Sequence, residues 1–263
     1  MHIHDRTFIV SGGASGLGLA TVRDLHAQGG YIAVLDLNAD SGAKVVSELG
    51  NDRTKFFEAD MSDSESVQSA VSSIASWVKE TGKAVGGVVP AAGVGNPAKL
   101  VDRHGDPVAM EALDFVLNIN LRGVLDLLRL TLPLMVKNNP TEADGERGVI
   151  ILVSSSAAFD GQPGQLAYAA SKGAMRSIAL VIARDHARDG IRCVAIAPSM
   201  FESNMTAQMS DKVRQSLQRV FEFPKRAGKA DEFARCVRFC VENVMLNGEV
   251  IRLDGATRMP SKM

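Results

Sequence analysis

Residues 7–18 read TFIVSGGASGLG, and this stretch decides the fold. Its first four residues are apolar and typical of a buried strand, whereas its last eight contain four glycines. A helical pattern then continues to about Gln28. Strand, glycine-rich turn and helix in this order predict the opening unit of a parallel α/β sheet. The alternative is an ordinary strand-to-helix connection.

Three glycines of this turn have the spacing that brings a backbone close to a phosphate. Gly12, Gly16 and Gly18 allow a tight turn, and the amides at the helix start would face a pyrophosphate. A second apolar stretch, residues 31–35, ends in Asp36, 18 residues beyond Gly18. A carboxylate there accepts hydrogen bonds from an adenosine ribose and repels a 2′-phosphate, so the sequence favours NAD over NADP. The alternative is an acidic cap at the strand end.

Apolar and amphipathic stretches alternate along the rest of the chain. They predict strands at 55–58, 85–89, 148–153, 192–197 and 250–253, and helices at 64–81, 110–137, 165–189 and 230–241. Right-handed βαβ crossovers place helices on both faces of such a sheet. We therefore expect a single α/β domain over residues 1–263, with a Rossmann-like doubly wound parallel sheet of about seven strands.

Composition narrows the possible partners. The net charge of −1 gives no broad attraction to nucleic acid or to a membrane surface, and no apolar run of transmembrane length is apparent. With 46% hydrophobic but only 5% aromatic residues, the core must be mostly aliphatic. The three cysteines lack metal-ligand spacing with histidine, so no metal site is expected.

Residues 168–172 read YAASK and place a phenol and an ammonium on one helix face. A free tyrosine titrates near pH 10, so acid–base chemistry at neutral pH needs a stabilised phenolate. We expect Lys172, helped by a positively charged cofactor, to lower the pKa of Tyr168. Alone, the pair also fits an aromatic ring resting on a lysine stem.

With these motifs, the chain resembles the short-chain dehydrogenase/reductase family over essentially its whole length. The family order also requires an asparagine and a serine, which Asn120 and Ser155 supply, and Ser155 lies 13 residues before Tyr168. Within the family, the chain is similar to the subgroup of type 2 3-hydroxyacyl-CoA dehydrogenases, also called type 10 17β-hydroxysteroid dehydrogenases. The similar segments are residues 157–162, 182–185, 196–198 and 246–256 and the polar insert 137–148.

The resemblance implies an interconversion of a secondary alcohol and a ketone by hydride transfer with a nicotinamide cofactor. Tyr168 would be the acid/base, and Ser155 would hydrogen-bond the substrate oxygen. Lys172 would bind the ribose, and Asn120 would hold a water that links this lysine to solvent. Taken singly, Ser155 could be a turn serine, Asn120 a buried backbone tie and Lys172 a surface charge.

The resemblance also implies contacts with NAD and with the substrate. The cofactor set is Gly12, Ser15, Gly16, Leu17, Gly18, Asp36, Asp60, Met61, Ala91, Gly93, Tyr168, Lys172, Pro198 and Phe201. The substrate set is Ser155, Gln162, Gln165 and Tyr168. The sequence departs from the family at Pro90-Ala91-Ala92-Gly93, where Asn-Asn-Ala-Gly is usual, at Ser199, where glycine is usual, and at Ser203, where threonine is common. We expect these changes to weaken cofactor binding or to reshape the loop.

The substrate is less defined than the cofactor. Residues 199–226 are rich in methionine and phenylalanine and predict either a lid over an apolar substrate or a helix packed on its own domain. No basic cluster for the phosphates of coenzyme A stands out. The leading interpretation is an NAD-dependent dehydrogenase of 3-hydroxyacyl-CoA or of a hydroxysteroid-like substrate. The alternatives are a ketoreductase or tailoring dehydrogenase of a specialised pathway, and a non-catalytic partner or scaffold in an assembly.

The last three residues, Ser261-Lys262-Met263, resemble the peroxisomal Ser-Lys-Leu address. They predict a peroxisomal protein of fatty acid metabolism; the alternative is a frayed polar tail on a cytoplasmic one. By resemblance we also expect a homotetramer or a homodimer.

Overall fold

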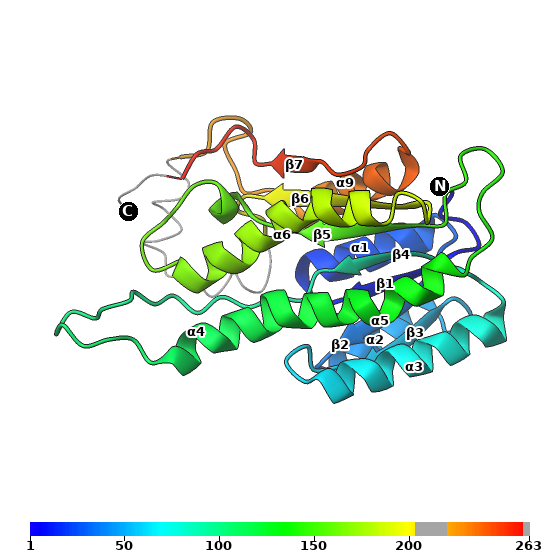
Figure 1. Ribbon diagram of the computed structural model, residues 1–263, viewed down its shortest axis with the longest axis horizontal. Helices are drawn as coiled ribbons and strands as arrows, with labels where there is room; N and C mark the ends of the chain where they lie inside the picture. The colour runs from blue at the N-terminus through cyan, green and yellow to red at the C-terminus, as the bar shows by residue number, and fades with distance from the viewer. Residues whose placement is uncertain (203–219, 260–263) are drawn as a thin grey trace.

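The computed structural model describes residues 1–202 and 220–259. They form one parallel sheet of seven strands in the order β3-β2-β1-β4-β5-β6-β7, with helices against both faces (Figure 1). The strands are β1 (Thr7–Ser11), β2 (Tyr31–Asp36), β3 (Thr54–Glu58), β4 (Val85–Pro90), β5 (Gly148–Val153), β6 (Ile191–Pro198) and β7 (Val250–Leu253). The predicted Rossmann-like α/β class is confirmed.

The helices follow the strands in the expected alternation. They are α1 (Gly16–Ala27), α2 (Ala39–Leu49), α3 (Ser64–Thr81), α4 (Met110–Leu117), α5 (Val124–Val136), α6 (Leu166–Asp185) and α9 (Ala230–Glu242). A π-helical turn, η1 (Asn118–Gly123), separates α4 from α5, and a short 3₁₀ turn, η2 (Ser156–Ala158), precedes α6. The sequence patterns did not predict α2.

Two apolar layers, one on each face of the sheet, explain why the strands are apolar throughout. Successive residues of β1 alternate between them: Ile9 packs in the layer formed with α3, α5 and α6. Phe8 and Val10 pack in the layer formed with α1 and α9. Every residue of β1 is buried. Such double-sided burial is typical of a parallel sheet between helices.

The strand order reverses at β1, which pairs with β2 on one side and β4 on the other. The chain runs outward from β1 to β3 and then returns to β4, so the connections after β1 and β4 leave in opposite directions. A crevice at the carboxyl ends of the strands opens at such a switch point. The glycine-rich turn lies there.

The turn after β1 requires glycine for steric reasons. A Cβ on Gly18 would lie 2.1 Å from the Gly12 carbonyl oxygen, which no side chain could tolerate. Gly12 has φ of +64°, and its Cβ would lie 2.8 Å from Ala92 Cα. The start of α1 is thereby brought directly onto the edge of the sheet.

The single helix expected over residues 110–137 is wrong in one respect, because η1 interrupts it. A Cβ on Gly123 would lie 2.1 Å from the Met61 carbonyl oxygen, so this turn passes very close to the β3–α3 connection. The wider turn also places the Asn120 side chain against the backbone of Val94. π-Helical turns of this kind are frequent at functional sites.

The polar insert, expected as a surface segment, contains a buried carboxylate. Glu146 is 5% exposed and accepts a hydrogen bond from Arg192 of β6 at 2.7 Å. Arg192 also donates to the carbonyl oxygens of Cys240 and Val241 at the end of α9. The pair therefore joins the insert to the helix on the far side of the sheet, where a cation suits the carbonyl end of a helix.

One helix among the described residues, α6, is long and apolar enough to cross a membrane, with 20 residues and a mean hydropathy of 1.2. The sequence patterns predicted no such segment. In the fold, α6 packs against β5 and β6 and buries Lys172. Of its most apolar 18 residues, 33% are buried, so α6 packs one face on the sheet and leaves apolar side chains such as Val181 exposed.

Two predicted features fall largely outside the described residues. The central part of the lid, residues 203–219, and the terminal tripeptide Ser261–Met263 belong to the part of the chain that the structure does not describe. The lid and the peroxisomal location stay predictions.

Candidate active site

A cavity of about 670 Å³ lies along the carboxyl edge of the sheet. Its lining includes every residue predicted to contact the cofactor or the substrate: Gly12, Ser15, Gly16, Leu17, Gly18, Asp36, Asp60, Met61, Ala91, Gly93, Ser155, Gln162, Gln165, Tyr168, Lys172, Pro198 and Phe201. The fold therefore brings together residues from all three thirds of the chain. The predicted catalytic residue that does not line the cavity is Asn120.

The end of the cavity next to α1 fits a dinucleotide. Helix α1 begins after Ser15, whose side chain makes no capping hydrogen bond, so its first amides are not satisfied by a capping side chain. Asp36, at the end of β2, accepts hydrogen bonds from the backbone N–H groups of Ala14 and Asn38, each at 3.1 Å. These bonds orient the carboxylate where β2 meets the glycine turn.

Asp60 is fixed in a similar way at the end of β3. Its Oδ1 atom accepts hydrogen bonds from the N–H and hydroxyl of Ser62 at 2.8 and 2.7 Å. Asp36 and Asp60 therefore place two carboxylates in the lining of the cavity, where β2 and β3 end.

The catalytic end is built by the end of β5 and the first two turns of α6. Ser155 caps the η2 turn, and its Oγ accepts a hydrogen bond from Ala157 N–H at 3.2 Å. The Ser155 and Tyr168 side chains both line the cavity, and the Ser155 hydroxyl lies close enough to the phenol to lower its pKa. The structure thus joins the two residues whose hydroxyl groups were predicted to meet at the substrate oxygen.

Lys172 lies one helical turn after Tyr168 and is held by the strand. Its Nζ atom donates a hydrogen bond to the Val153 carbonyl oxygen at 2.9 Å and lies 5.8 Å from the centre of the Tyr168 ring. The Ser154 hydroxyl donates to the Lys172 carbonyl oxygen at 2.8 Å. Lys172 is buried, which rules out the alternative of a surface charge.

Burial dominates the ionisation of both groups. It raises the pKa of Tyr168, and the hydrogen bond from Ser155 opposes this effect without cancelling it. Burial also lowers the pKa of Lys172 to about 8. The expectation that Lys172 lowers the pKa of the phenol is therefore not met by the protein's own groups, because desolvation of the phenolate outweighs them. A lowered phenol pKa requires further positive charge beside Tyr168.

Asn120 is a fully buried tie between η1 and the loop after β4. Its Nδ2 atom donates to the Val94 carbonyl oxygen at 2.9 Å and to Ser171 Oγ at 3.3 Å, and its Oδ1 atom accepts from Val94 N–H at 2.8 Å. A Cβ on Gly93 would lie 3.3 Å from this Oδ1 and 3.5 Å from Lys172 Nζ, so both groups border one small space. The predicted role in holding a water stays a prediction.

The departures from the usual family pattern have structural compensation at one position. Where a side-chain amide is missing, the Ser11 hydroxyl accepts a hydrogen bond from Ala92 N–H at 3.2 Å. Ser199 lines the cavity, and its buried Oγ has no hydrogen-bond partner among the described residues. A buried hydroxyl in this state fits a polar group of a bound ligand. Ser203 lies outside the described residues.

The cavity also includes residues that no sequence motif indicated. Pro97 comes from the loop after β4, which is joined to the substrate side through the Ala98–Gln165 bridge. Met259 comes from the segment after β7. Neither residue lies in a motif, because its place depends on contacts between segments far apart in the chain.

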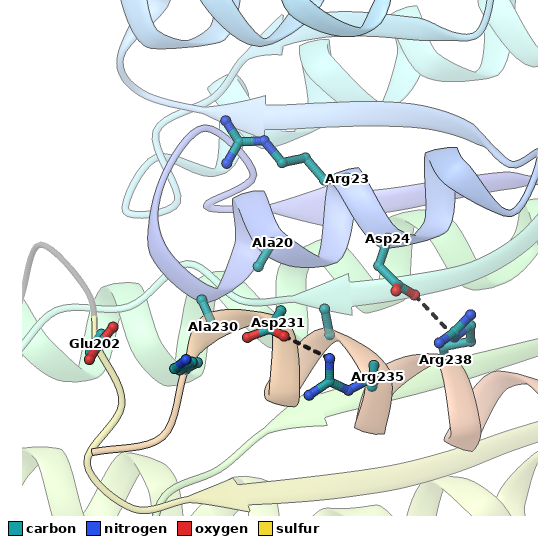
Figure 2. A pocket seen from close by; sticks show the side chains of 10 residues that line it. Ala20, Arg23, Asp24, Glu202, Ala230, Asp231, Arg235 and Arg238 are labelled. Atoms are coloured by element: carbon teal, nitrogen blue, oxygen red, sulfur yellow. Dashed lines mark hydrogen bonds and ion pairs between the residues drawn. The ribbon is translucent and has the colours of Figure 1, made fainter. Parts of the chain in front are cut away.

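A second cavity, of about 630 Å³, lies between α1 and α9 (Figure 2). Its guanidinium groups face carboxylates: Arg238 pairs with Asp24 at 3.4 Å and Arg235 with Asp231 at 2.6 Å. These charges balance one another at the surface. Of the residues predicted to be catalytic, Ser155, Tyr168 and Lys172 line the first cavity, and none lines this second one.

Comparisons with known proteins agree with this geometry. The family model described as short chain dehydrogenase matches residues 6–214. The chain is 41% identical over 259 residues to 3-hydroxyacyl-CoA dehydrogenase type-2 of Drosophila melanogaster, covering 98% of this chain and 99% of that protein. It is 40% identical over 252 residues to the protein of the same name from Homo sapiens, covering 95% and 94%. A crystal structure of 3-hydroxyacyl-CoA dehydrogenase type-2 from Mycobacterium avium matches with a TM-score of 0.90 at 35% identity and covers 100% of both chains.

The depressed pKa of Lys172 predicts a pH-dependent effect on stability. The unfolded chain keeps this proton up to about pH 10.4, whereas the folded protein releases it at about pH 8. Between these values the unfolded state binds more protons, so the contribution of Lys172 to the free energy of unfolding rises with pH, by at most about 1.4 kcal/mol per pH unit.

Urea unfolding of the wild type and of Lys172→Met, at several values between about pH 7 and about pH 9.5, measures this effect. We expect the difference in unfolding free energy to move in favour of the wild type as pH rises. Lys44→Met, which removes an exposed lysine of α2, is the control. A difference that stays constant or shrinks with pH would contradict the assignment.

Proposed function

The chain belongs to the short-chain dehydrogenase family and is therefore an oxidoreductase that uses a nicotinamide cofactor. We propose that it uses NAD to interconvert 3-hydroxyacyl-CoA and 3-ketoacyl-CoA, or a hydroxysteroid-like alcohol and its ketone. The observation that carries the proposal is that the Ser155 and Tyr168 side chains line one cavity beside the buried Lys172. Two hydroxyl donors at one point suit an oxygen atom that gains negative charge during reaction. The named relatives support acyl-CoA as the substrate class.

The residues of the chain divide the proton chemistry among them. When bound, the nicotinamide supplies or accepts the hydride at the substrate carbon. In reduction, the Tyr168 hydroxyl transfers its proton to the ketone oxygen, and in oxidation the phenolate takes the alcohol proton back. Ser155 donates to the same oxygen, and its position is fixed by Ala157 N–H. Lys172, already bonded to Val153, has further donors for a ribose hydroxyl.

Several groups would hold the cofactor. The amides after Gly16 would face its pyrophosphate, and Asp36 would accept hydrogen bonds from its adenosine ribose. The Ser199 hydroxyl lines the cavity and has no hydrogen-bond partner among the described residues, so it would bond to a polar group of the cofactor. These features support a dinucleotide, and the carboxylate of Asp36 favours NAD.

The protein is proposed to assemble as a homotetramer or a homodimer. Helices α4 and α6 pack together, and α4, α5 and α6 leave large apolar side chains exposed, including Phe115, Leu125 and Val181 at 49, 43 and 54%. An apolar surface of this kind suits burial against a second copy. Light scattering that finds only monomers at all concentrations would contradict this proposal.

Replacement of Tyr168 tests the reaction. We expect Tyr168→Phe to lower kcat by about 10²- to 10⁴-fold, because the proton donor is lost, while NAD binding measured by calorimetry is retained. The chain has one other tyrosine, Tyr31, which packs near Trp77 away from the cavity, so Tyr31→Phe is the matched control. Unchanged turnover in Tyr168→Phe would refute the proton-transfer role.

The same steady-state assay, read from NADH absorbance, compares acetoacetyl-CoA with ketosteroids and cyclic ketones. Preference for acetoacetyl-CoA supports the proposal. Turnover confined to cyclic or other apolar ketones would instead indicate a tailoring ketoreductase, and no turnover of any substrate would favour a scaffold.

Replacement of Asp36 tests the choice of cofactor. Asp36→Asn keeps an oxygen for one of the two N–H groups, those of Ala14 and Asn38, that now donate to the carboxylate, and it removes the negative charge facing a 2′-phosphate. We expect kcat/KM with NADP relative to NAD to rise by about tenfold or more. Asp40→Asn, on the exposed start of α2, controls for a general change in charge. A wild type that prefers NADP would overturn the NAD assignment.

A further inference from the structure

The segment after β7, residues 254–259, contributes to the cavity at its predicted substrate end. Met259 from this segment lines the cavity together with Gln162, Gln165 and Tyr168. These three residues come from the η2–α6 loop and from α6 itself, nearly a hundred residues away in the chain. An apolar, adaptable side chain from a separate part of the fold thus lines the cavity beside the residues predicted to bind the substrate.

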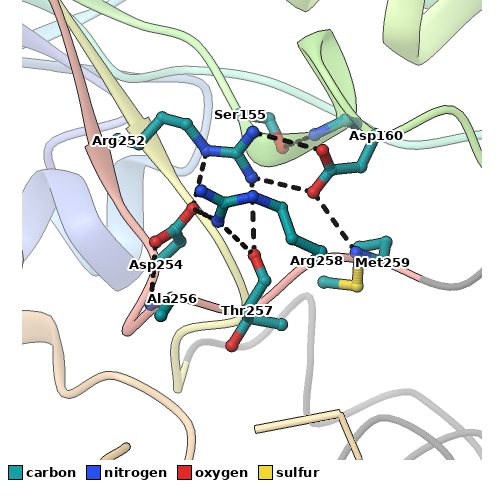
Figure 3. A network of polar contacts seen from close by, with 9 residues as sticks. Ser155, Asp160, Arg252, Asp254, Ala256, Thr257, Arg258 and Met259 are labelled. Carbon is teal, nitrogen blue, oxygen red and sulfur yellow. Dashed lines mark hydrogen bonds and ion pairs between the residues drawn. The ribbon is translucent and has the colours of Figure 1, made fainter. Parts of the chain in front are cut away.

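The backbone of Met259 is held by one carboxylate. Asp160 Oδ2 accepts a hydrogen bond from Met259 N–H at 3.2 Å (Figure 3). The same carboxylate receives two hydrogen bonds from Arg252, at 3.1 and 2.8 Å, in a bidentate arrangement. We call Asp160 and Arg252 the clasp, because together they join the loop after Ser155 to the segment that carries Met259.

The clasp is anchored on both sides. The Phe159 ring lies between two guanidinium groups, that of Arg176 at 4.4 Å and that of Arg252 at 4.6 Å. Arg176 is one helical turn beyond Lys172 on α6, so the ring connects the catalytic helix to β7. Cation–π stacking of this kind orients a guanidinium as well as stabilising it.

Burial and charge balance favour a closed clasp. The side chains of Asp160 and Arg252 are 12 and 20% exposed. Arg252 also donates to Asp254 at 2.6 Å, and Arg258 supplies a second cation to Asp254 at 2.8 Å. Two guanidinium groups therefore face two carboxylates. Burial raises the pKa of Asp160, but hydrogen bonds from Arg252 and Met259 outweigh it, so the pKa lies below its usual value and the carboxylate stays charged at neutral pH.

We infer that Met259 is a specificity-determining residue, whose side chain forms the wall that limits the apolar part of the substrate, and that the Asp160–Arg252 clasp is a positioning element that fixes this wall. The inference rests on the proposed function, since it assigns the substrate side of the same cavity. Met259 touches the substrate, whereas Asp160 and Arg252 act through it. The substrates concerned are 3-ketoacyl-CoA molecules that differ in acyl length or branching.

The test compares kcat/KM for a long-chain 3-ketoacyl-CoA with kcat/KM for acetoacetyl-CoA, and the ratio of the two is the selectivity. We expect Met259→Ala to raise the selectivity about tenfold, because it shortens the side chain that forms the wall. Met259→Phe should lower it. Met245→Ala is the matched control, since Met245 is 86% exposed and does not line the cavity.

The clasp is tested by the same ratio. Asp160→Ala should raise the selectivity in the same direction as Met259→Ala, and the double variant should equal Met259→Ala alone, because a displaced wall leaves nothing more to remove. A merely structural role of Asp160 would lower the melting temperature without moving the ratio. If Asp160→Ala fails to fold, Asp160→Asn, which weakens the charged pair with Arg252 and so loosens the clasp, serves in its place and should raise the selectivity by a smaller factor.

The outcomes separate this inference from the proposed function. A wild type that reduces acyl-CoA substrates, with a selectivity unchanged in folded Met259→Ala, would overturn the inference alone. A wild type that reduces no acyl-CoA would refute the proposed substrate class. In that case the variants are compared on the apolar ketones that the wild type accepts, and an unchanged preference for size would again overturn the inference.

Discussion

The active site depends on the contacts between the last residues of β5 and the first turns of α6. Two consecutive positions bond to the helix: Val153 accepts from Lys172 Nζ, and Ser154 donates to the Lys172 carbonyl oxygen. Because one bond uses the backbone of the strand and the other uses a side chain, they set the position of the helix along the strand. A shift of one residue would break both. The catalytic geometry is therefore a property of the register between strand and helix.

Burying Lys172 and Tyr168 in these contacts costs free energy of folding. The burial is therefore explained by function and not by stability. A lysine buried with one carbonyl partner has its pKa lowered to about 8, and the neighbouring phenol has its pKa raised by burial. Neither group gains from leaving water. Strongly perturbed groups that share a cavity are typical of sites that move protons. A cationic ring beside Tyr168 would favour the phenolate, which links the ionisation of the site to cofactor binding.

The two ends of the cavity are built on different principles. At the cofactor end, a short local stretch suffices, because Gly12 and Gly18 turn the chain and the next strand delivers Asp36 beside them. At the substrate end, the wall is assembled from segments far apart in the chain, and Arg252 joins them through Asp160. Local assembly suits a cofactor common to a family, whereas an assembled wall can vary from member to member.

The sequence alone determined the sheet and its glycine turn, because periodic burial and backbone sterics act over a few neighbouring positions. Its resemblance to a family indicated residues that line the cavity, and its spacing placed Tyr168 and Lys172 on one helix face. It did not reveal α2, the π-helical turn or the buried state of Glu146, and it offered the buried backbone tie of Asn120 only as an alternative. Nor did it indicate the direction of the Tyr168 pKa or the presence of Met259 in the cavity. Those features were decided by tertiary structure, since desolvation and contacts across the chain exist only once distant segments pack together.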